Sequence, residues 1–215
     1  MRSKSQYLGS MKYSLTVICL SSGSLLFSQT GGNNTYEFLN LAIPARVAAL
    51  GGTLISVKEN DLNLSFQNPA LLDSTVHNHL ALSYIDYFTD ISYGYASYSR
   101  TFRKVGCFSA GIQYLDYGSF LSASVTGETG SPFSASEQSL NISYSKPIDS
   151  SFSVGGTLKS IYSRLEGYNS FGNAMDIGAV YNNRKHLFSS AIVIKNIGKQ
   201  WKTYNVVHEA LPFEI

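Results

Sequence analysis

Polar and apolar residues alternate along most of the chain after residue 79, in short segments separated by polar turns. In the clearest segment, from Ser139 to Lys146, Leu140, Ile142 and Tyr144 alternate with serine and asparagine. Successive side chains of a β-strand point to opposite faces, so this segment has one apolar face and one polar face. The pattern predicts an all-β chain of antiparallel strands.

The segment from Phe152 to Tyr162 repeats this alternation, and five further segments follow it less regularly. The faces of the last one cannot be assigned from the pattern, and a weaker additional strand is expected at Leu54–Val57. The seven predicted strands are Leu80–Ile85, Ile91–Ser99, Phe108–Tyr114, Ser139–Lys146, Phe152–Tyr162, Met175–Tyr181 and Phe188–Gly198.

The connections between these strands differ in length. Phe88–Asp90, Pro147–Ser150 and Asn182–His186 are short, whereas Gly118–Ser136 and Leu165–Phe171 are longer. Outer-membrane barrels have short turns on one side, longer loops on the other and strands of about ten residues. The polar faces carry serine, glycine, asparagine and threonine, which suits a filled barrel interior. An antiparallel transmembrane β-barrel is therefore favoured, with a soluble β-sandwich as the alternative.

The N-terminus has the pattern of an export signal. Lys12 precedes a short apolar run at 15–20, which small residues interrupt before residues 25–27 resume it. The run is shorter than the roughly 20 residues of a membrane-spanning helix. We predict a signal peptide at residues 1–28, cleaved after Ser28, and a location in the outer membrane. A lipoprotein cysteine at Cys19 is the alternative, but small residues are missing before it.

The composition narrows the function classes. Charged residues are 14% of the chain, against roughly a quarter in a soluble domain. Three of the 16 basic residues lie in the predicted signal peptide, so the rest of the chain is close to neutral and nucleic-acid binding is not expected. Only Cys107 would remain after cleavage, so no disulfide, metal cluster or cofactor is predicted.

Residues 29–78 contain segments, at 36–39, 44–52 and 61–72, that are too apolar for a linker and lack strand alternation. We expect them to pack, plug-like, inside or across one mouth of the barrel, before the barrel strands of residues 79–215. Asn68 is predicted to cap a short helix that begins at Pro69. Arg46 and Asp61 are expected to pair inside the barrel mouth in a structural role, with ligand binding as the alternative.

An ordered set of residues in this segment resembles the PorV/PorQ family. These proteins are outer-membrane barrels of the type IX secretion system, distantly similar to the FadL fatty-acid transporters. Residues 29–39 look closest to the PorQ branch. The residues that carry the resemblance are Arg46, Gly51, Gly52, Asp61, Asn68, Pro69 and Ala70.

The resemblance implies a barrel of about fourteen strands, within the range of outer-membrane barrels. Residues 79–215 would then be its N-terminal half, truncated at the C-terminus. It also implies a non-enzymatic protein, surrounded by outer-membrane lipid, that anchors a PorZ-like surface partner beside PorU- and PorV-like proteins. A FadL-like transporter of a hydrophobic small molecule is the alternative.

Two sequence patterns could be taken for a catalytic site or a metal site, but the residues around them do not fit either. Ser143 and Lys146 match the Ser-x-x-Lys signature of penicillin-recognising enzymes, but on a strand they point to opposite faces. His77 and His79 share a strand face without further ligands at metal-binding spacing. No catalytic, cofactor or metal site is predicted.

The two longer loops are the candidate partner surface. Phe120, Phe133 and Tyr168 are aromatic residues in otherwise small or polar surroundings, and such exposed aromatics often anchor interfaces. The alternative is that both loops fold back and plug the barrel.

Overall fold

The computed structural model describes residues 34–42, 44–124, 126–183, 185–205 and 208–215. The predicted signal peptide and Cys19 lie outside these residues. The 3₁₀ helices are η2 (Glu37–Asn40), η3 (Leu62–Phe66), η4 (Pro69–Leu71) and η5 (Ser74–Val76), and the α-helix is α2 (Ala45–Ala49). The strands are β1 (Leu80–Asp86), β2 (Ser92–Phe102), β3 (Gly106–Ala123), β4 (Thr129–Pro147), β5 (Phe152–Leu165), β6 (Tyr168–Asn183) and β7 (Phe188–Lys202).

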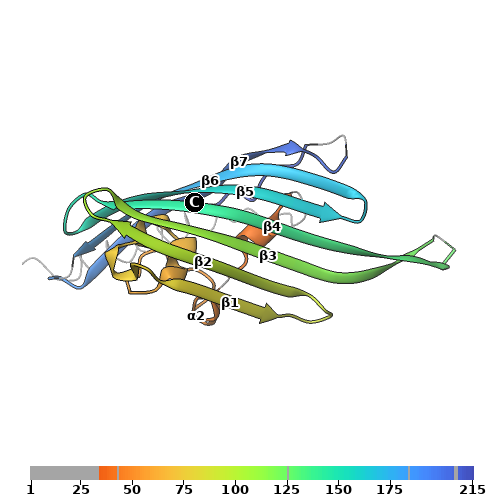
Figure 1. Ribbon diagram of the computed structural model, residues 1–215, viewed down its shortest axis with the longest axis horizontal. Coiled ribbons are helices and arrows are strands. Elements are labelled where there is room, and N and C mark those ends of the chain that lie inside the picture. The colour runs from red at the N-terminus through yellow and green to blue at the C-terminus, as the bar shows by residue number, and fades with distance from the viewer. Residues whose placement is uncertain (1–33, 43, 125, 184, 206–207) are drawn as a thin grey trace, which may run out of the picture. The chain divides into compact units, whose positions relative to one another are not determined.

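The seven strands form one antiparallel sheet in the order β1 to β7, each bonded to its neighbour in sequence (Figure 1). The predicted all-β class is therefore confirmed. Connections at residues 103–105, 148–151 and 185–187 lie at one end of the sheet, here called the short-turn end. The β1–β2, β3–β4 and β5–β6 connections lie at the opposite, long-hairpin end.

Both predicted long loops are wrong, because the strands continue through them. Within Gly118–Ser136, β3 and β4 stay paired and Phe120 lies opposite Phe133. This hairpin extends beyond its neighbours (Figure 1). Within Leu165–Phe171, only Glu166 and Gly167 lie outside the strands. Ladder hydrogen bonds use the backbone, so small and polar residues extend a strand without apolar alternation.

The strand predicted at Leu54–Val57 is also wrong. Two carbonyls of this segment accept hydrogen bonds from side chains and not from a neighbouring strand. Asn68 Nδ2 donates to Ile55 O at 2.9 Å, and Ser189 Oγ donates to Ser56 O at 2.5 Å. The segment thus joins the N-terminal residues to the sheet without adding a strand.

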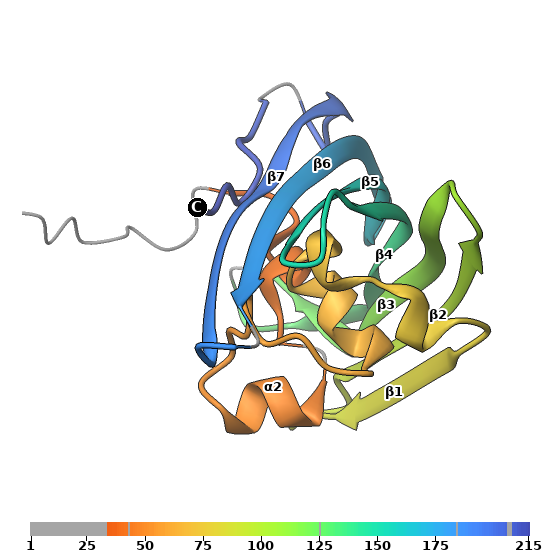
Figure 2. The same ribbon diagram turned by 90° about the vertical axis from the view of Figure 1, so that its left-hand side faces the viewer.

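The sheet curves around residues 34–78, which lie on its concave face (Figure 2). One apolar cluster joins Val47, Leu64 and Leu71 to Val180 of β6. A second joins Tyr36 and Phe38 to strand residues; its buried sheet members are Tyr93, Tyr95, Leu115, Ile161 and Ala174. The core therefore lies between the N-terminal segment and the sheet. None of the helices in the described ranges is long and apolar enough to cross a membrane.

Candidate functional site

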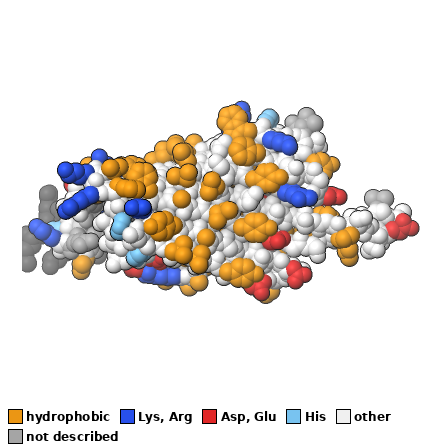
Figure 3. Space-filling view, viewed as in Figure 1, with side chains coloured by type: hydrophobic (Ala, Val, Ile, Leu, Met, Phe, Trp, Pro, Cys, Tyr) orange, Lys and Arg blue, Asp and Glu red, His pale blue; other side chains and the backbone are white. Residues whose placement is uncertain are grey.

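Large apolar side chains are exposed on the convex face of the sheet. Leu82 is 69% exposed, Leu158 62% and Ile192 61%. Figure 3 shows hydrophobic side chains spread across the sheet. Soluble monomers rarely expose an apolar patch larger than a few hundred Å², whereas this face receives such residues from every strand. We call this face the outer wall.

The outer wall is ordered by side-chain type. Aliphatic residues occupy its middle: Leu80, Leu82, Ile112, Leu140, Ile142, Leu158, Ile177, Ile192 and Ile197. Tyr98 lies among them, opposite Leu80. Aromatic residues nearer the short-turn end are Phe102, Phe108, Tyr144, Phe152, Tyr181 and Phe188, and those at the long-hairpin end are Tyr84, Tyr114, Tyr162, Phe171 and Trp201. Arg100 and Lys199 also point outward. Arg100 Cζ lies 5.4 Å from the ring centroid of Phe102, and Lys199 Nζ lies 5.6 Å from the ring centroid of Trp201.

The concave face carries many polar residues beside the apolar ones that contact the N-terminal segment. Ser143 Oγ lies 2.8 Å from Thr157 Oγ1, and Asn141 Nδ2 donates to Gln113 Oε1 at 3.0 Å. The buried polar residues of this face include Ser97, Ser99, Ser109, Ser139, Ser145 and Ser163. An exposed apolar face combined with a buried face rich in polar residues reverses the usual arrangement of a soluble sandwich.

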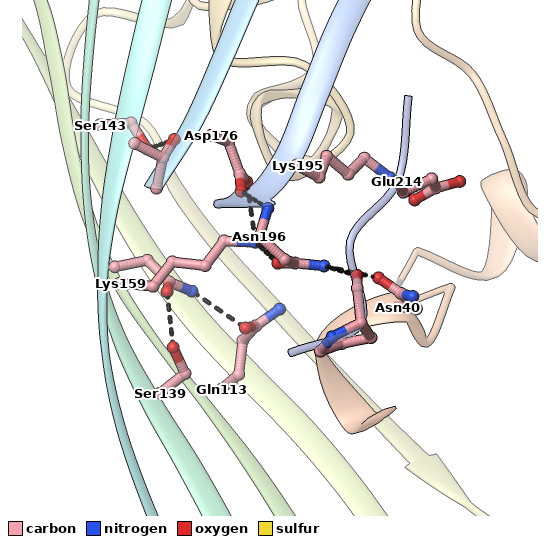
Figure 4. A network of polar contacts seen from close by, with 12 residues as sticks. Asn40, Gln113, Ser139, Ser143, Lys159, Asp176, Lys195, Asn196 and Glu214 are labelled. Carbon is pink, nitrogen blue, oxygen red and sulfur yellow. Dashed lines mark hydrogen bonds and ion pairs between the residues drawn. The ribbon is translucent and has the colours of Figure 1, made fainter. Parts of the chain in front are cut away.

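A buried ion pair lies at the centre of the concave face (Figure 4). Lys159 Nζ of β5 is 2.7 Å from Asp176 Oδ2 of β6, with side chains only 7% and 3% exposed. Lys159 also donates to Asn196 Oδ1 at 2.8 Å. Both charges are therefore paired and hydrogen-bonded, as buried charges must be.

A β-bulge in β7 completes this network. Met175 pairs with Ile197 but Ile177 pairs with Ile194, so two residues, Lys195 and Asn196, lie opposite Asp176. Both are buried, and Asn196 adopts a left-handed φ of 58°, which asparagine tolerates better than most residues. The backbone N–H of Asn196 donates to Asp176 Oδ1 at 2.8 Å. The bulge thus gives the carboxylate a second donor.

Asn196 also links three parts of the chain. Its Nδ2 donates at 2.8 Å to Asn40 Oδ1 of η2 and to the carbonyl of Pro212. Beside it, Lys195 Nζ is 2.9 Å from Glu214. The N-terminal segment and residues 208–215 are therefore fastened to β7 at the bulge. Sequence reasoning missed this network because its members become neighbours only through strand register.

The predicted cap at Asn68 is confirmed. Its Oδ1 accepts from the Ala70 N–H at 3.0 Å, and Pro69 begins η4. The turn packs directly on sheet backbone: a Cβ on Gly178 would lie 1.9 Å from Asn68 Oδ1, and one on Gly155 would lie 2.6 Å from Pro69 C. The Asn-Pro-Ala motif and these two glycines therefore form one close contact.

The other motif residues have separate roles. Arg46 pairs with Glu59 and not, as predicted, with Asp61; its Nη2 donates to Glu59 Oε1 at 2.9 Å. This pair is exposed, and the hydrogen bonds from Arg46 lower the pKa of Glu59. Asp61 instead caps η3 by accepting from Asn63 N. Gly51 and Gly52 have φ of 99° and 88°, which favours glycine.

The predicted partner-contact residues all lie at the long-hairpin end. Phe120 and Phe133 stack with ring centroids 5.3 Å apart, and Tyr168 at the start of β6 is 56% exposed. Phe133 also lines a hollow of about 420 Å³ with Arg164 and Glu166 of the adjacent hairpin. The structure thus brings the two phenylalanines together beside the β5–β6 turn.

An apolar cavity of about 370 Å³ opens at the same end. Phe38 and Leu41 line one side, and Tyr87, Phe88 and Leu115 line the other. Two tyrosines outside the strands are shielded from solvent, because Tyr36 is buried and Tyr204 is half-buried. Burial raises the pKa of Tyr36 above its usual range and that of Tyr204 to about 12, so both stay protonated at neutral pH.

The residues that suggested chemistry have structural surroundings. Ser143 is buried and Lys146 exposed on the opposite face, as expected of a strand. His77 Nδ1 accepts from the Thr101 N–H at 3.0 Å. Across the described ranges, no group of three histidine, cysteine or acidic side chains could hold a metal ion. Comparison with protein-family models and with curated proteins gives no match.

Adding one methyl group should affect the stability of the protein differently at Gly155 and at Gly156, the two adjacent glycines of β5. Gly155→Ala meets the backbone of Pro69, whereas the Cβ in Gly156→Ala would contact only Asp176 O, at 3.4 Å. We expect Gly155→Ala to lower the free energy of unfolding by roughly 1–3 kcal/mol through overpacking, with a small effect of Gly156→Ala. Urea unfolding in detergent measures both, and equal losses would contradict the close contact.

Breaking the buried ion pair should be costly. Asp176→Ala leaves Lys159 charged and buried, which we expect to lower the free energy of unfolding by roughly 3–5 kcal/mol. Replacing both residues, as Lys159→Met with Asp176→Leu, should recover much of that loss. Glu59→Ala, which breaks an exposed pair, is the control with little expected effect. The role of the pair is refuted if Asp176→Ala matches the control.

Proposed function

We propose that this chain is an outer-membrane β-barrel protein whose outer wall contacts lipid. The observation that carries the proposal is the reversed polarity of the sheet, with aliphatic residues outside between two sets of aromatic residues. Outer-membrane barrels have an outward apolar band of about 25 Å flanked by aromatic girdles. The proposal includes closure of the sheet into a barrel, because a membrane-spanning sheet needs every backbone group paired.

The height of the apolar band supports this proposal. On β6, ten residue steps separate Phe171 from Tyr181, a span of about 33 Å along the strand. With the strand tilted by about 40°, as is usual in such barrels, the band is about 25 Å high. This height matches the hydrocarbon layer.

The role that the resemblance favours is a non-enzymatic component of the type IX secretion system. In this role the long-hairpin end faces the cell exterior and anchors a PorZ-like surface protein, with PorU- and PorV-like proteins nearby. A specific protein contact usually needs about 800 Å² on each partner, and the extended β3–β4 hairpin offers exposed area. Leu121 is 68% exposed there, beside the stacked Phe120.

The apolar cavity at the long-hairpin end favours a second candidate, a FadL-like transporter. Its lining of Phe38, Leu41 and Phe88 suits a hydrophobic small molecule. The polar concave face below it argues against a continuous apolar path. Fatty-acid uptake by cells lacking the gene, measured beside cargo secretion, separates the two candidates.

Charge placed on the outer wall tests the membrane location. Leu158→Arg should destabilise the protein in lipid vesicles by roughly 2–4 kcal/mol, the cost of arginine near the bilayer midplane. Ser150→Arg, at an exposed position of the β4–β5 turn, should have little effect. Reversible denaturation in vesicles gives both values. If Leu158→Arg is neutral, or if the protein fractionates with soluble material, the wall does not face lipid.

Removing aromatic groups at the long-hairpin end tests the partner surface. We expect Phe120→Ser with Phe133→Ser and Tyr168→Ser to release the surface partner from cells while the protein still assembles. Leu187→Ser is the control, since Leu187 is 94% exposed at the short-turn end. Immunoblots of washed cells and medium measure attachment. Unchanged attachment in the triple variant would exclude this end as the docking surface.

A further inference from the structure

Charges are unevenly distributed between the two ends of the sheet. Figure 3 shows Lys and Arg side chains gathered at one end and several acidic side chains at the other. Basic residues at the short-turn end are Arg100, Arg103, Lys104, Lys146 and Lys185. Acidic residues at the long-hairpin end are Asp86, Asp90, Asp116, Glu128 and Glu166, with Arg164, Lys199 and Lys202 among them.

Three of the basic residues surround one pocket of about 380 Å³ at the short-turn end. Arg103 and Lys104 belong to the β2–β3 turn, and Lys146 lies near the end of β4. The pocket also has an apolar side, made by Phe102, Val105 and Pro147. Val105 is 51% exposed and Phe102 46% exposed. The pocket is therefore both cationic and apolar.

The acids of this pocket already have partners. Asp73 pairs with Lys58 at 3.7 Å and accepts from Thr75 N at 2.8 Å. Asp149 accepts from the backbone N–H groups of Ser151 and Phe152 in the β4–β5 turn. Arg103, Lys104 and Lys146 have no acidic partner in the ranges that the structure describes. The pocket thus has a surplus of positive charge.

We propose that this pocket binds the phosphate of an anionic phospholipid from the membrane leaflet at the short-turn end. Arginine and lysine are the usual phosphate-binding side chains. The apolar side of the pocket is continuous with the outer wall, because Phe102 contacts Phe108 and Phe108 contacts Tyr144, with ring centroids 5.8 and 4.8 Å apart. Acyl chains can therefore lie on the wall while the headgroup sits among the cations.

This inference rests on the proposed membrane location and adds a preferred lipid to it. A soluble anion would use the cations but leave Phe102, Val105 and Pro147 without a role. A zwitterionic headgroup carries its own ammonium group, which the surplus positive charge repels. Juxtamembrane Lys and Arg contribute about 1 kcal/mol each at anionic surfaces, which supports selectivity for a net negative headgroup.

Spin-labelled lipids in vesicles containing the protein test the inference. Electron paramagnetic resonance measures the motionally restricted fraction of spin-labelled phosphatidylglycerol and phosphatidylcholine, and the ratio gives the selectivity. We expect the unaltered protein to prefer phosphatidylglycerol. Arg103→Gln with Lys104→Gln and Lys146→Gln should reduce this preference by about fivefold or more, since one cation alone is worth roughly that factor. The control removes the same charge at the long-hairpin end, as Arg164→Gln with Lys199→Gln and Lys202→Gln, and should keep the preference.

Each remaining result has a defined meaning. The inference is overturned if the pocket variant keeps its preference for phosphatidylglycerol. It is also overturned if excess inorganic phosphate reduces the preference of the unaltered protein more than chloride does at equal ionic strength. If the pocket variant fails to insert, Lys146→Gln alone decides by the same measurement, and Lys146→Arg should restore the preference. If the unaltered protein restricts neither lipid, the proposed membrane location fails. If it restricts both equally, the location stands and the pocket proposal fails.

Discussion

The ion pair of Lys159 and Asp176 is the interaction on which the concave face depends. Two buried charges can be retained only when their mutual attraction and further hydrogen bonds offset the loss of water. Asp176 obtains its further donor from the backbone of Asn196, which the bulge in β7 brings to 2.8 Å. If the same residues formed a regular strand without the bulge, the side chains after Asn196 would turn to the other face, and Ile197 would point at the concave face.

The same arrangement connects the two faces of the sheet. Because Gly155 and Gly178 have no side chain on the concave face, residues 34–78 can pack directly on the strand backbone there. The apolar contacts that this segment makes, such as those of Val47 and Leu64 with Val180, supply a core that the sheet lacks by itself. Many other large apolar residues lie exposed on the convex face, where lipid would cover them.

Alternation predicted the positions of the seven strands, because one face of each is apolar. It could not assign the faces of β7, since the bulge at Lys195 and Asn196 changes the period in mid-strand. It also missed the extension of β3 and β4, where Phe120 and Phe133 pair among serine and glycine. The cap at Asn68 was predicted correctly because capping is local. The partner of Arg46 and the network around Asp176 depend on chain path and strand register, which no local pattern contains.

The contact of the Asn-Pro-Ala turn with bare strand backbone has a consequence for the order of folding. The hydrogen bond from Ser153 Oγ to the Ala70 carbonyl joins residues 83 positions apart, whereas each hairpin pairs residues that are close in sequence. Contacts between nearby residues form faster than distant ones. We therefore expect the hairpins to form before residues 34–78 pack against them. Until then, the strand backbone at Gly155 and Gly178 would be uncovered. The N-terminal segment, although synthesised first, would then be among the last parts to reach its final position.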